Sequence, residues 1–196
     1  MIKCHQKEWL LTVRQRVRII AGKWRSRVLT FPSVEGLRPT GDRIRETLFN
    51  WLAPNIAGAS CLDLFSGSGA LCFEALSRGA GDCLALEKSP KALAALNENK
   101  TLFNAAELTL RRADTVAYLR NSPDKPFDIV FVDPPFDLNV LTEVCTLLEN
   151  NHWLAADCQI YCEFSARHNS FAPPPNWRIE KSKAAGGVNY LLYSRI

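Results

Sequence analysis

No stretch of the sequence reaches 18 uninterrupted apolar residues, which excludes a membrane-spanning helix of ordinary length. The first 18 residues also lack the features of a secretory signal. Charged residues stand on both sides of a very short apolar patch, and no small-residue cleavage site follows it. With neither an anchor nor an export signal, we expect a cytoplasmic protein that does not associate with membranes.

The seven cysteines include no C-x-x-C pair, and their number is odd. Several lie within apolar patterns typical of strands or helices, and Cys158 and Cys162 have no nearby pair of histidines. These features disfavour both a disulfide framework and a metal site. We therefore expect no metal, and cysteines that are reduced and mostly buried as small apolar side chains.

Positive charge is concentrated at the front of the chain. Residues 1–45 carry 11 Lys/Arg against 3 Asp/Glu, a net charge of +8, whereas the remaining 151 residues have a net charge of −4. A basic front on a mildly acidic body favours a face that binds a polyanion. The alternative is a solvated leader with no binding role.

The front of the chain divides into two predicted segments. Residues 1–15 form a leader for which we predict no structure. Residues 16–35 predict a basic hairpin, whose strands 16–22 and 27–31 are joined by the turn KWRS.

A helix is expected to follow the hairpin, within 36–52. Thr40 or Asp42 is the expected N-cap, and the apolar stripe of the helix ends at Leu52. Arg43 and Arg45 fall in its first turns, where the helix dipole disfavours cations, so another interaction must hold them there.

The rest of the body, within 36–196, alternates strands with helices. Near-continuous apolar strands separated by helices predict an α/β fold with a parallel sheet covered on both faces. A Pro-rich turn and a terminal antiparallel hairpin (177–183 and 188–195) follow, and we find no internal repeat. The expected strands are 60–65, 82–87, 107–112, 127–133 and 158–164, and the expected helices are 69–78, 90–103, 114–120 and 138–150.

The ends of the first three strands predict a binding site for an adenosyl ligand. Gly67 and Gly69 allow a tight turn and a close backbone approach before a helix N-terminus. Glu87, 20 residues after Gly67, is placed to accept hydrogen bonds from a ribose, although a surface or capping role is equally open. Asp114 follows the third strand, where it can meet an adenine edge. These features do not separate a nicotinamide dinucleotide from S-adenosylmethionine.

The segment D-P-P-F at 133–136 distinguishes between these two cofactors. It resembles the [D/N]-P-P-[F/Y/W] motif of class I methyltransferases that modify exocyclic amino groups. The Asp133 carboxylate and the Pro134 carbonyl can accept the two amine hydrogens and aim the nitrogen lone pair at a methyl donor. The two prolines hold that backbone rigid, and Phe136 offers a face for a flipped base. A capped turn at the end of a strand is the alternative without function.

Five segments together resemble the RsmD family of bacterial 16S rRNA guanine-N2 methyltransferases, over nearly the whole chain from about residue 16. The most specific is GLRPTGDRIRETLFNWL, whereas the glycine loop is shared by many methyltransferases. Cys72 departs from the more usual small residue, and residues 1–15 have no recognisable counterpart. The segments are RIIAGKWRSR (18–27), GLRPTGDRIRETLFNWL (36–52), LDLFSGSGALCFEALSRGA (62–80), IVFVDPPF (129–136) and AGGVNYLLY (185–193).

The resemblance implies a Rossmann-like class I methyltransferase domain over 36–196, with a seven-stranded, mostly parallel sheet. It implies an enzyme that uses S-adenosylmethionine to methylate N2 of a specific guanine in 16S rRNA, within the 30S subunit or an assembly intermediate. We expect a monomer. Asp133, Pro134 and Phe136 would hold the target guanine. The cofactor would be bound by Asp63, Ser66, Gly67, Gly69, Glu87, Asp114 and Thr40. RNA would be bound by Arg18, Lys23, Arg25, Arg27, Arg38 and Arg43, with Trp24 available for stacking or packing, and Glu46 lies in the same block.

Three other functions remain to be distinguished. An enzyme of the same fold that methylates N6 of adenine in DNA also fits D-P-P-F, but the basic N-terminal block argues against it. A nicotinamide oxidoreductase predicts a fingerprint near the N-terminus and no D-P-P-F. An RNA-binding assembly factor with a vestigial cofactor site is disfavoured by the intact glycine loop and Glu87.

Overall fold

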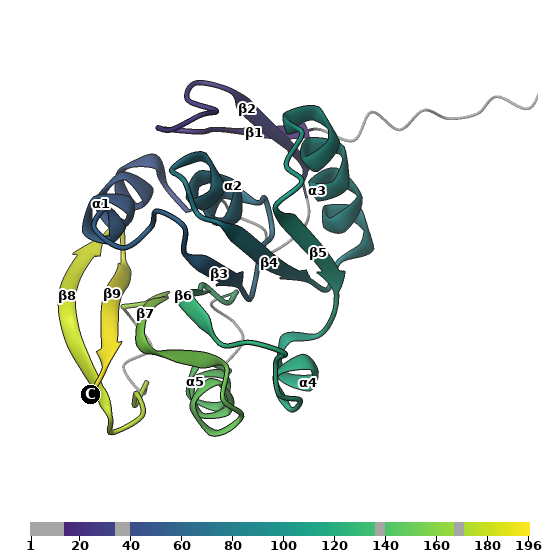
Figure 1. The fold of residues 1–196 in the computed structure, drawn as a ribbon. Coiled ribbons are helices and arrows are strands. Elements are labelled where there is room, and N and C mark those ends of the chain that lie inside the picture. The colour runs from purple at the N-terminus through teal and green to yellow at the C-terminus, as the bar shows by residue number, and fades with distance from the viewer. Residues whose placement is uncertain (1–13, 34–39, 136–139, 167–170) are drawn as a thin grey trace, which may run out of the picture.

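The computed structural model describes residues 14–33, 40–135, 140–166 and 171–196. Its main feature is a seven-stranded sheet with the order β5-β4-β3-β6-β7-β9-β8 (Figure 1). The first five strands pair in parallel, β9 pairs antiparallel with β7, and β8 pairs antiparallel with β9, as predicted. The strands are β3 (Ser60–Asp63), β4 (Asp82–Glu87), β5 (Leu108–Arg112), β6 (Phe127–Val132), β7 (Leu154–Ser165), β8 (Trp177–Ala185) and β9 (Val188–Arg195).

Helices cover both faces of this sheet (Figure 1). The helices α1 (Asp42–Leu52), α2 (Ala70–Ser77) and α3 (Pro90–Phe103) share one buried apolar cluster with one face. The other face packs against α4 (Thr115–Leu119) and α5 (Leu141–Asn150), which contribute to a second cluster. The chain leaves β3 toward β4 on one side and later returns to β6 on the other side. The strand order therefore reverses between the ends of β3 and β6, and this topological switch point is where ligands bind in such sheets.

The predicted basic hairpin is a separate two-stranded antiparallel sheet, β1 (Arg14–Arg18) and β2 (Val28–Pro32). It lies beside α2 and α3 (Figure 1), and its Val17, Leu29 and Phe31 belong to the same buried cluster as those helices. The side chain of Asn99 in α3 accepts a hydrogen bond from the N–H of Thr30 and donates one to its carbonyl. The hairpin therefore shares its core with the body of the protein.

The loop of the hairpin approaches the end of α2 closely. Gly22 has φ +83°, and a Cβ on it would lie 1.7 Å from the carbonyl oxygen of Ser77, so only glycine fits there. That carbonyl accepts a hydrogen bond from the N–H of Lys23, and the Ser77 hydroxyl accepts one from the N–H of Trp24. The turn predicted at KWRS is thus fixed by backbone contacts with α2.

Several predicted element boundaries needed correction. Among the described residues no side chain caps α1: Gly41 is its N-cap, and Asp42 is instead its first residue. Strand β7 begins at Leu154 rather than at residue 158, because its early residues continue the sheet beside Phe127. Helix α3 begins as predicted, since the Ser89 hydroxyl accepts from the N–H of Ala92 and Pro90 opens the helix.

The cysteines that the structure describes are free and buried (Cys61, Cys72, Cys83, Cys145, Cys158 and Cys162), whereas Cys4 lies outside the described residues. Within the described ranges, no helix is both long and apolar enough to cross a membrane.

Candidate active site

Three carboxyl groups gather where β3, β6 and β7 end. Asp63 pairs in register with Phe131, and Phe131 with Tyr161. Since side chains alternate between the faces of a sheet, Asp133 and Glu163, each two residues further along, fall on the same face as Asp63. In the part of the chain that the structure describes, no group of His, Cys, Asp or Glu has the arrangement of a metal site. The carboxyls therefore form an acidic edge at the switch point.

The glycine loop follows β3 and is joined to the end of β4. Gly67 and Gly69 have φ values of +49° and +82°. The N–H of Gly67 donates to Oε2 of Glu87 at 2.8 Å, and Oε1 of Glu87 accepts from the N–H of Ser89 at 2.6 Å. Glu87 thus holds the loop in shape, which a surface acid would not do.

Ser66 and Gly69 complete this loop. Ser66 is buried, and its hydroxyl donates to the carbonyl of Asp63. A Cβ at Gly69 would lie 2.7 Å from Leu96 and 2.8 Å from Phe73, so any other residue would displace these side chains in addition to straining the positive φ. The loop presents backbone rather than side chains, which suits close contact with a ligand.

Asp63 is a buried carboxyl with unused hydrogen-bonding capacity. It is 2% exposed, and its Oδ2 has no hydrogen-bond partner within the described residues. Burial raises the pKa of Asp63 to about 7, and the negative charge of Glu87 adds to this, while the N–H groups of Phe65 and Cys72 oppose it. Such an oxygen is suited to a cationic or hydrogen-donating ligand.

Asp114 lies beyond the end of β5 and caps α4. Its Oδ1 accepts from the N–H of Ala117 at 3.1 Å, and its Oδ2 accepts from Nζ of Lys88 at 2.9 Å. These interactions lower the pKa of Asp114, with the Lys88 hydrogen bond as the largest cause. The structure therefore brings Asp63, Glu87 and Asp114 to the ends of three neighbouring strands.

The D-P-P segment begins directly after β6. Asp133 is half-buried, Pro134 is buried, and the Thr40 hydroxyl donates to Oδ2 of Asp133 at 3.0 Å. Thr40 was assigned to the cofactor by resemblance, yet the contact that the structure shows is with Asp133. Phe136 lies outside the described residues, so its expected contact with a base stays a prediction.

Glu163 was missed by the sequence reasoning. It is 5% exposed, and Oε2 of its carboxyl accepts a hydrogen bond from the Tyr161 hydroxyl at 2.7 Å. The available signal was an acid in a mostly apolar predicted strand (158–164), the next strand along the chain after D-P-P.

Arg45, one of the two cations in the first turns of α1, is held there by interactions outside its helix. Its side chain is completely buried and donates to the carbonyls of Thr40 and Arg18 and to the carboxylate of Asp42. Its Nη1 also lies 3.5 Å from the buried Glu74. Arg45 therefore ties the segment that carries Thr40 to the hairpin.

The structure changes the roles expected for part of the basic hairpin. Trp24 is 6% exposed and packs against Phe73 and Phe103, so of the two expected roles it shows packing, and stacking on RNA is wrong for this buried ring. Lys23 donates to Glu107 at 3.0 Å, and the guanidinium of Arg27 lies over the Phe103 ring while donating to the carbonyl of Leu102. Both cations hold the hairpin against the body.

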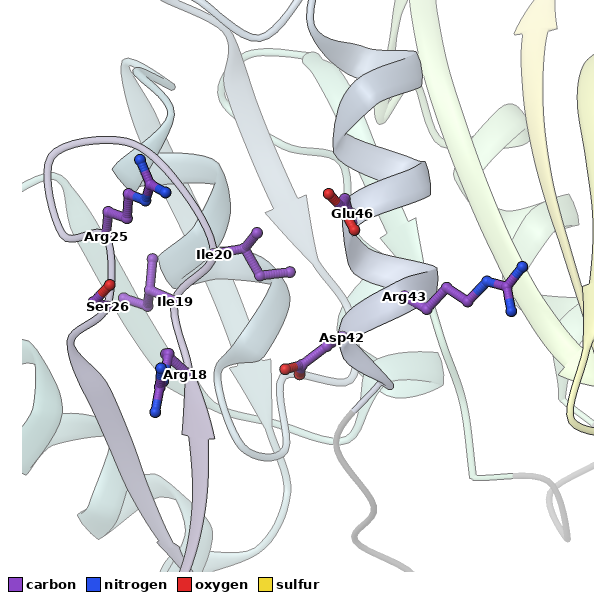
Figure 2. A pocket seen from close by; sticks show the side chains of 8 residues that line it. All are labelled: Arg18, Ile19, Ile20, Arg25, Ser26, Asp42, Arg43 and Glu46. Atoms are coloured by element: carbon purple, nitrogen blue, oxygen red, sulfur yellow. The ribbon is translucent and has the colours of Figure 1, made fainter.

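A cleft of about 360 Å³ separates the hairpin loop from the first turns of α1. Figure 2 shows Arg18 and Arg25 on the hairpin side and Asp42 and Glu46 on the helix side. Arg43 also borders the cleft, but its guanidinium points away from the hairpin (Figure 2). All three arginines are exposed, whereas Arg38 lies outside the described residues.

Similarity to known proteins shows the family of this chain. The family model described as Conserved hypothetical protein 95, which represents the RsmD family, matches residues 17–194. The chain belongs to this family.

Relatives within the family are similar over most of their length. Ribosomal RNA small subunit methyltransferase D of Escherichia coli is 44% identical over 180 residues, which cover 92% of this chain and 90% of that protein. The protein of the same name from Haemophilus influenzae is also 44% identical, with coverages of 90% and 93%. The solved structure of Escherichia coli yhhF has a TM-score of 0.86 and 41% identity, and the match covers 92% of this chain and 98% of that one. The RsmD resemblance and the class I methyltransferase fold predicted from the sequence are confirmed.

Proposed function

We propose that this member of the RsmD family transfers a methyl group from S-adenosylmethionine to the exocyclic N2 amine of a specific guanine in small-subunit rRNA. The observation that carries the proposal is the position of Asp133, directly after β6 and across the switch point from the glycine loop of β3. The names of the relatives, which give them as methyltransferases of small-subunit rRNA, support the same reaction.

The residues at the strand ends fit the proposed cofactor. S-adenosylmethionine carries positive charge on its sulfonium and ammonium groups, and the acids at the ends of β3, β4 and β6 surround its expected position with negative potential. The unpartnered Oδ2 of Asp63 is suited to the ammonium group, and Glu87 to the ribose hydroxyls. The backbone of Ser66, Gly67 and Gly69 would lie against the ligand, and Asp114 near the adenine. When bound, this cofactor supplies an electrophilic methyl group.

The D-P-P corner fits the proposed acceptor. The lone pair of an exocyclic guanine amine is delocalised into the ring, so the amine must be oriented to react. The Asp133 carboxylate and the Pro134 carbonyl would accept its two hydrogens, and the Thr40 hydroxyl fixes the orientation of the carboxylate. The amine nitrogen would take the methyl carbon from the cofactor, which leaves as a neutral thioether, and the proton that the nitrogen loses would pass to the Asp133 carboxylate or to solvent. Phe136 would support the flipped base.

The exposed arginines of the hairpin and α1 would bind rRNA phosphates. Arg18, Arg25 and Arg43 have no side-chain ion pair within the described residues, so they can neutralise phosphates without breaking internal contacts. We propose a 30S subunit or an assembly intermediate as the form in which the rRNA is met.

Methyl transfer from labelled S-adenosylmethionine to small subunits from cells lacking this enzyme tests the proposal. Total DNA is assayed alongside, and the labelled nucleoside is identified by mass spectrometry. We expect N2-methylguanosine in 16S rRNA. Label in DNA adenine would retain the chemistry of D-P-P and overturn the rRNA substrate. Label in neither, with cofactor bound, would refute the proposed reaction.

A further inference from the structure

Asp133 and Glu163 are neighbouring carboxyls on two adjacent parallel strands. Val132, the last residue of β6, pairs in register with Cys162 of β7, so the next residue along each chain is an acid. Glu163 is 5% exposed and lies beside Tyr190 of β9 on its other side. Glu163 is therefore enclosed between neighbouring strands rather than open to solvent.

Within the part of the chain that the structure describes, each carboxyl accepts from one hydroxyl and neither forms an ion pair. Thr40 donates to Asp133 at 3.0 Å, and Tyr161 donates to Glu163 at 2.7 Å. Among the described residues, the charged groups that act on Asp133 are Glu163 and Asp63, both of them acids. A hydroxyl donor stabilises each carboxylate less than a guanidinium or ammonium partner would.

Ionising both acids is therefore costly. The pKa of Asp133 is raised well above its usual range by burial, then by the charges of Glu163 and Asp63, while the Thr40 hydrogen bond opposes the shift. Burial also raises the pKa of Glu163, against the effect of the Tyr161 hydroxyl. Adjacent carboxyls of this kind, one buried and one half-buried, titrate as one unit and retain a proton above the pH at which a single acid loses it.

We propose that Asp133 and Glu163 share one proton in the free protein and release it when a cationic methyl donor binds at the neighbouring glycine loop. The inference rests on the proposed function, because it takes the sulfonium of S-adenosylmethionine as the cation. A positive charge beside the pair stabilises the second carboxylate. The proton leaves to solvent, and both acids are then ionised.

This coupling would order the events at the site. Asp133 becomes a full acceptor for the amine hydrogens only when the methyl donor is present. The free protein is spared two uncompensated buried charges. Glu163 is in this account a positioning residue, which acts through Asp133 and does not touch the guanine.

Calorimetric titration in two buffers of different ionisation enthalpy measures the protons released on binding. We compare S-adenosylmethionine with S-adenosylhomocysteine, which keeps the ammonium group but has a neutral sulfur. We expect the wild type to release more protons with the cationic ligand, by up to about one per site. Both ligands carry the same ammonium group. Any proton that Asp63 releases on binding this group therefore contributes equally to both measurements and cancels in the difference.

Variants assign this difference to the pair. In Glu163→Gln the Asp133 carboxyl loses its charged neighbour, so the pair that shares the proton no longer exists and the difference between the two ligands should be largely lost. Glu143→Gln, a change at an exposed acid of α5, should retain the wild-type difference. If Glu163→Gln does not fold, Asp133→Asn removes the pair in the same way and should also abolish the difference.

Equal proton release with both ligands in the wild type would overturn the inference, as would an undiminished difference in Glu163→Gln or Asp133→Asn. Neither result would affect the proposed function. Failure of the wild type to bind either ligand would instead overturn the cofactor assignment itself, and the inference with it.

Discussion

Arg45 and Glu74 form an ion pair at the contact between α1, α2 and the hairpin, with Nη1 and Oε2 3.5 Å apart and neither side chain exposed. Glu74 also accepts hydrogen bonds from the N–H groups of Ile20 and Ala21 and from Nε of Arg78. Arg45 donates to the carbonyl of Thr40. One buried pair therefore joins the hairpin, the glycine-loop helix and the segment that orients Asp133.

Removing one member of this pair should destabilise the protein strongly. Glu74→Ala leaves the buried Arg45 with only the exposed Asp42 as a carboxylate partner and removes the acceptor of the Ile20 and Ala21 N–H groups, and such losses cost about 3–5 kcal/mol. The free energy of unfolding from urea titration measures the effect. As a control, Glu98→Ala breaks the exposed pair with Arg14 and should cost under about 1 kcal/mol. Similar costs for the two variants would show that the buried pair has no special role.

Asp63 should make stability fall as pH rises. Its pKa is raised from 3.8 to about 7, so the native state holds this proton more tightly than the unfolded state does. The free energy of unfolding then decreases between about pH 4 and pH 7, and the full cost is present above pH 7. Asp63→Asn should remove this fall and be more stable by a few kcal/mol above pH 7.

Denaturant titrations across this pH range, compared between wild type and Asp63→Asn, test whether the free energy of unfolding falls as pH rises. Asp157→Asn, at an exposed position, should reproduce the wild-type profile. A difference between Asp63→Asn and wild type that does not vary with pH would contradict the assignment. The same variant should bind S-adenosylmethionine more weakly, since the oxygen proposed for its ammonium group is lost.

The order of strands and helices could be predicted because the body repeats a strong local pattern. Ser89 and Pro90 mark a helix start by their own chemistry, and D-P-P marks the end of β6, so these sites needed no knowledge of distant contacts. The acids of the cofactor site could be found for the same reason. Parallel strands bring their carboxyl ends to one edge, whatever their register.

Residues whose roles depend on distant partners could not be assigned in this way. Arg45 resembles a surface cation in a helical pattern, and only the fold shows Glu74 beside it. Glu163 becomes a neighbour of Asp133 through the register of β6 and β7, which the sequence does not specify. The burial of Trp24 depends on Phe73 and Phe103, far along the chain.

Thr40 should affect the rate of methyl transfer through Asp133. Thr40→Val keeps the shape of the side chain but removes the hydroxyl that orients the carboxylate, and loss of one such hydrogen bond slows a reaction by roughly tenfold. Thr40→Ser should restore most of the rate. Single-turnover methylation of 30S subunits measures both. Equal rates for Thr40→Val and Thr40→Ser would show that Thr40 has only a packing role.

Asp133→Ala should abolish turnover while leaving the affinity for S-adenosylmethionine within a few-fold of the wild-type value. The carboxylate is proposed to position the amine, so its loss removes orientation and charge stabilisation in the transition state. Cofactor affinity by calorimetry and methyl transfer to 30S subunits are measured on the same preparation. Normal turnover in this variant would refute the role of Asp133.

The cleft arginines should contribute to RNA binding through phosphate contacts. Replacing Arg18 and Arg25 with glutamine should weaken the binding of 16S rRNA fragments and reduce the slope of log affinity against log salt by roughly one to two. Lys125→Gln is the matched control. This lysine pairs with Asp82 at the first residue of β4, at the opposite edge of the sheet from the site, and its loss should leave the slope unchanged. An unchanged slope in the double variant would mean that the exposed arginines of the hairpin are only solvated, and that RNA reaches the D-P-P corner by another surface.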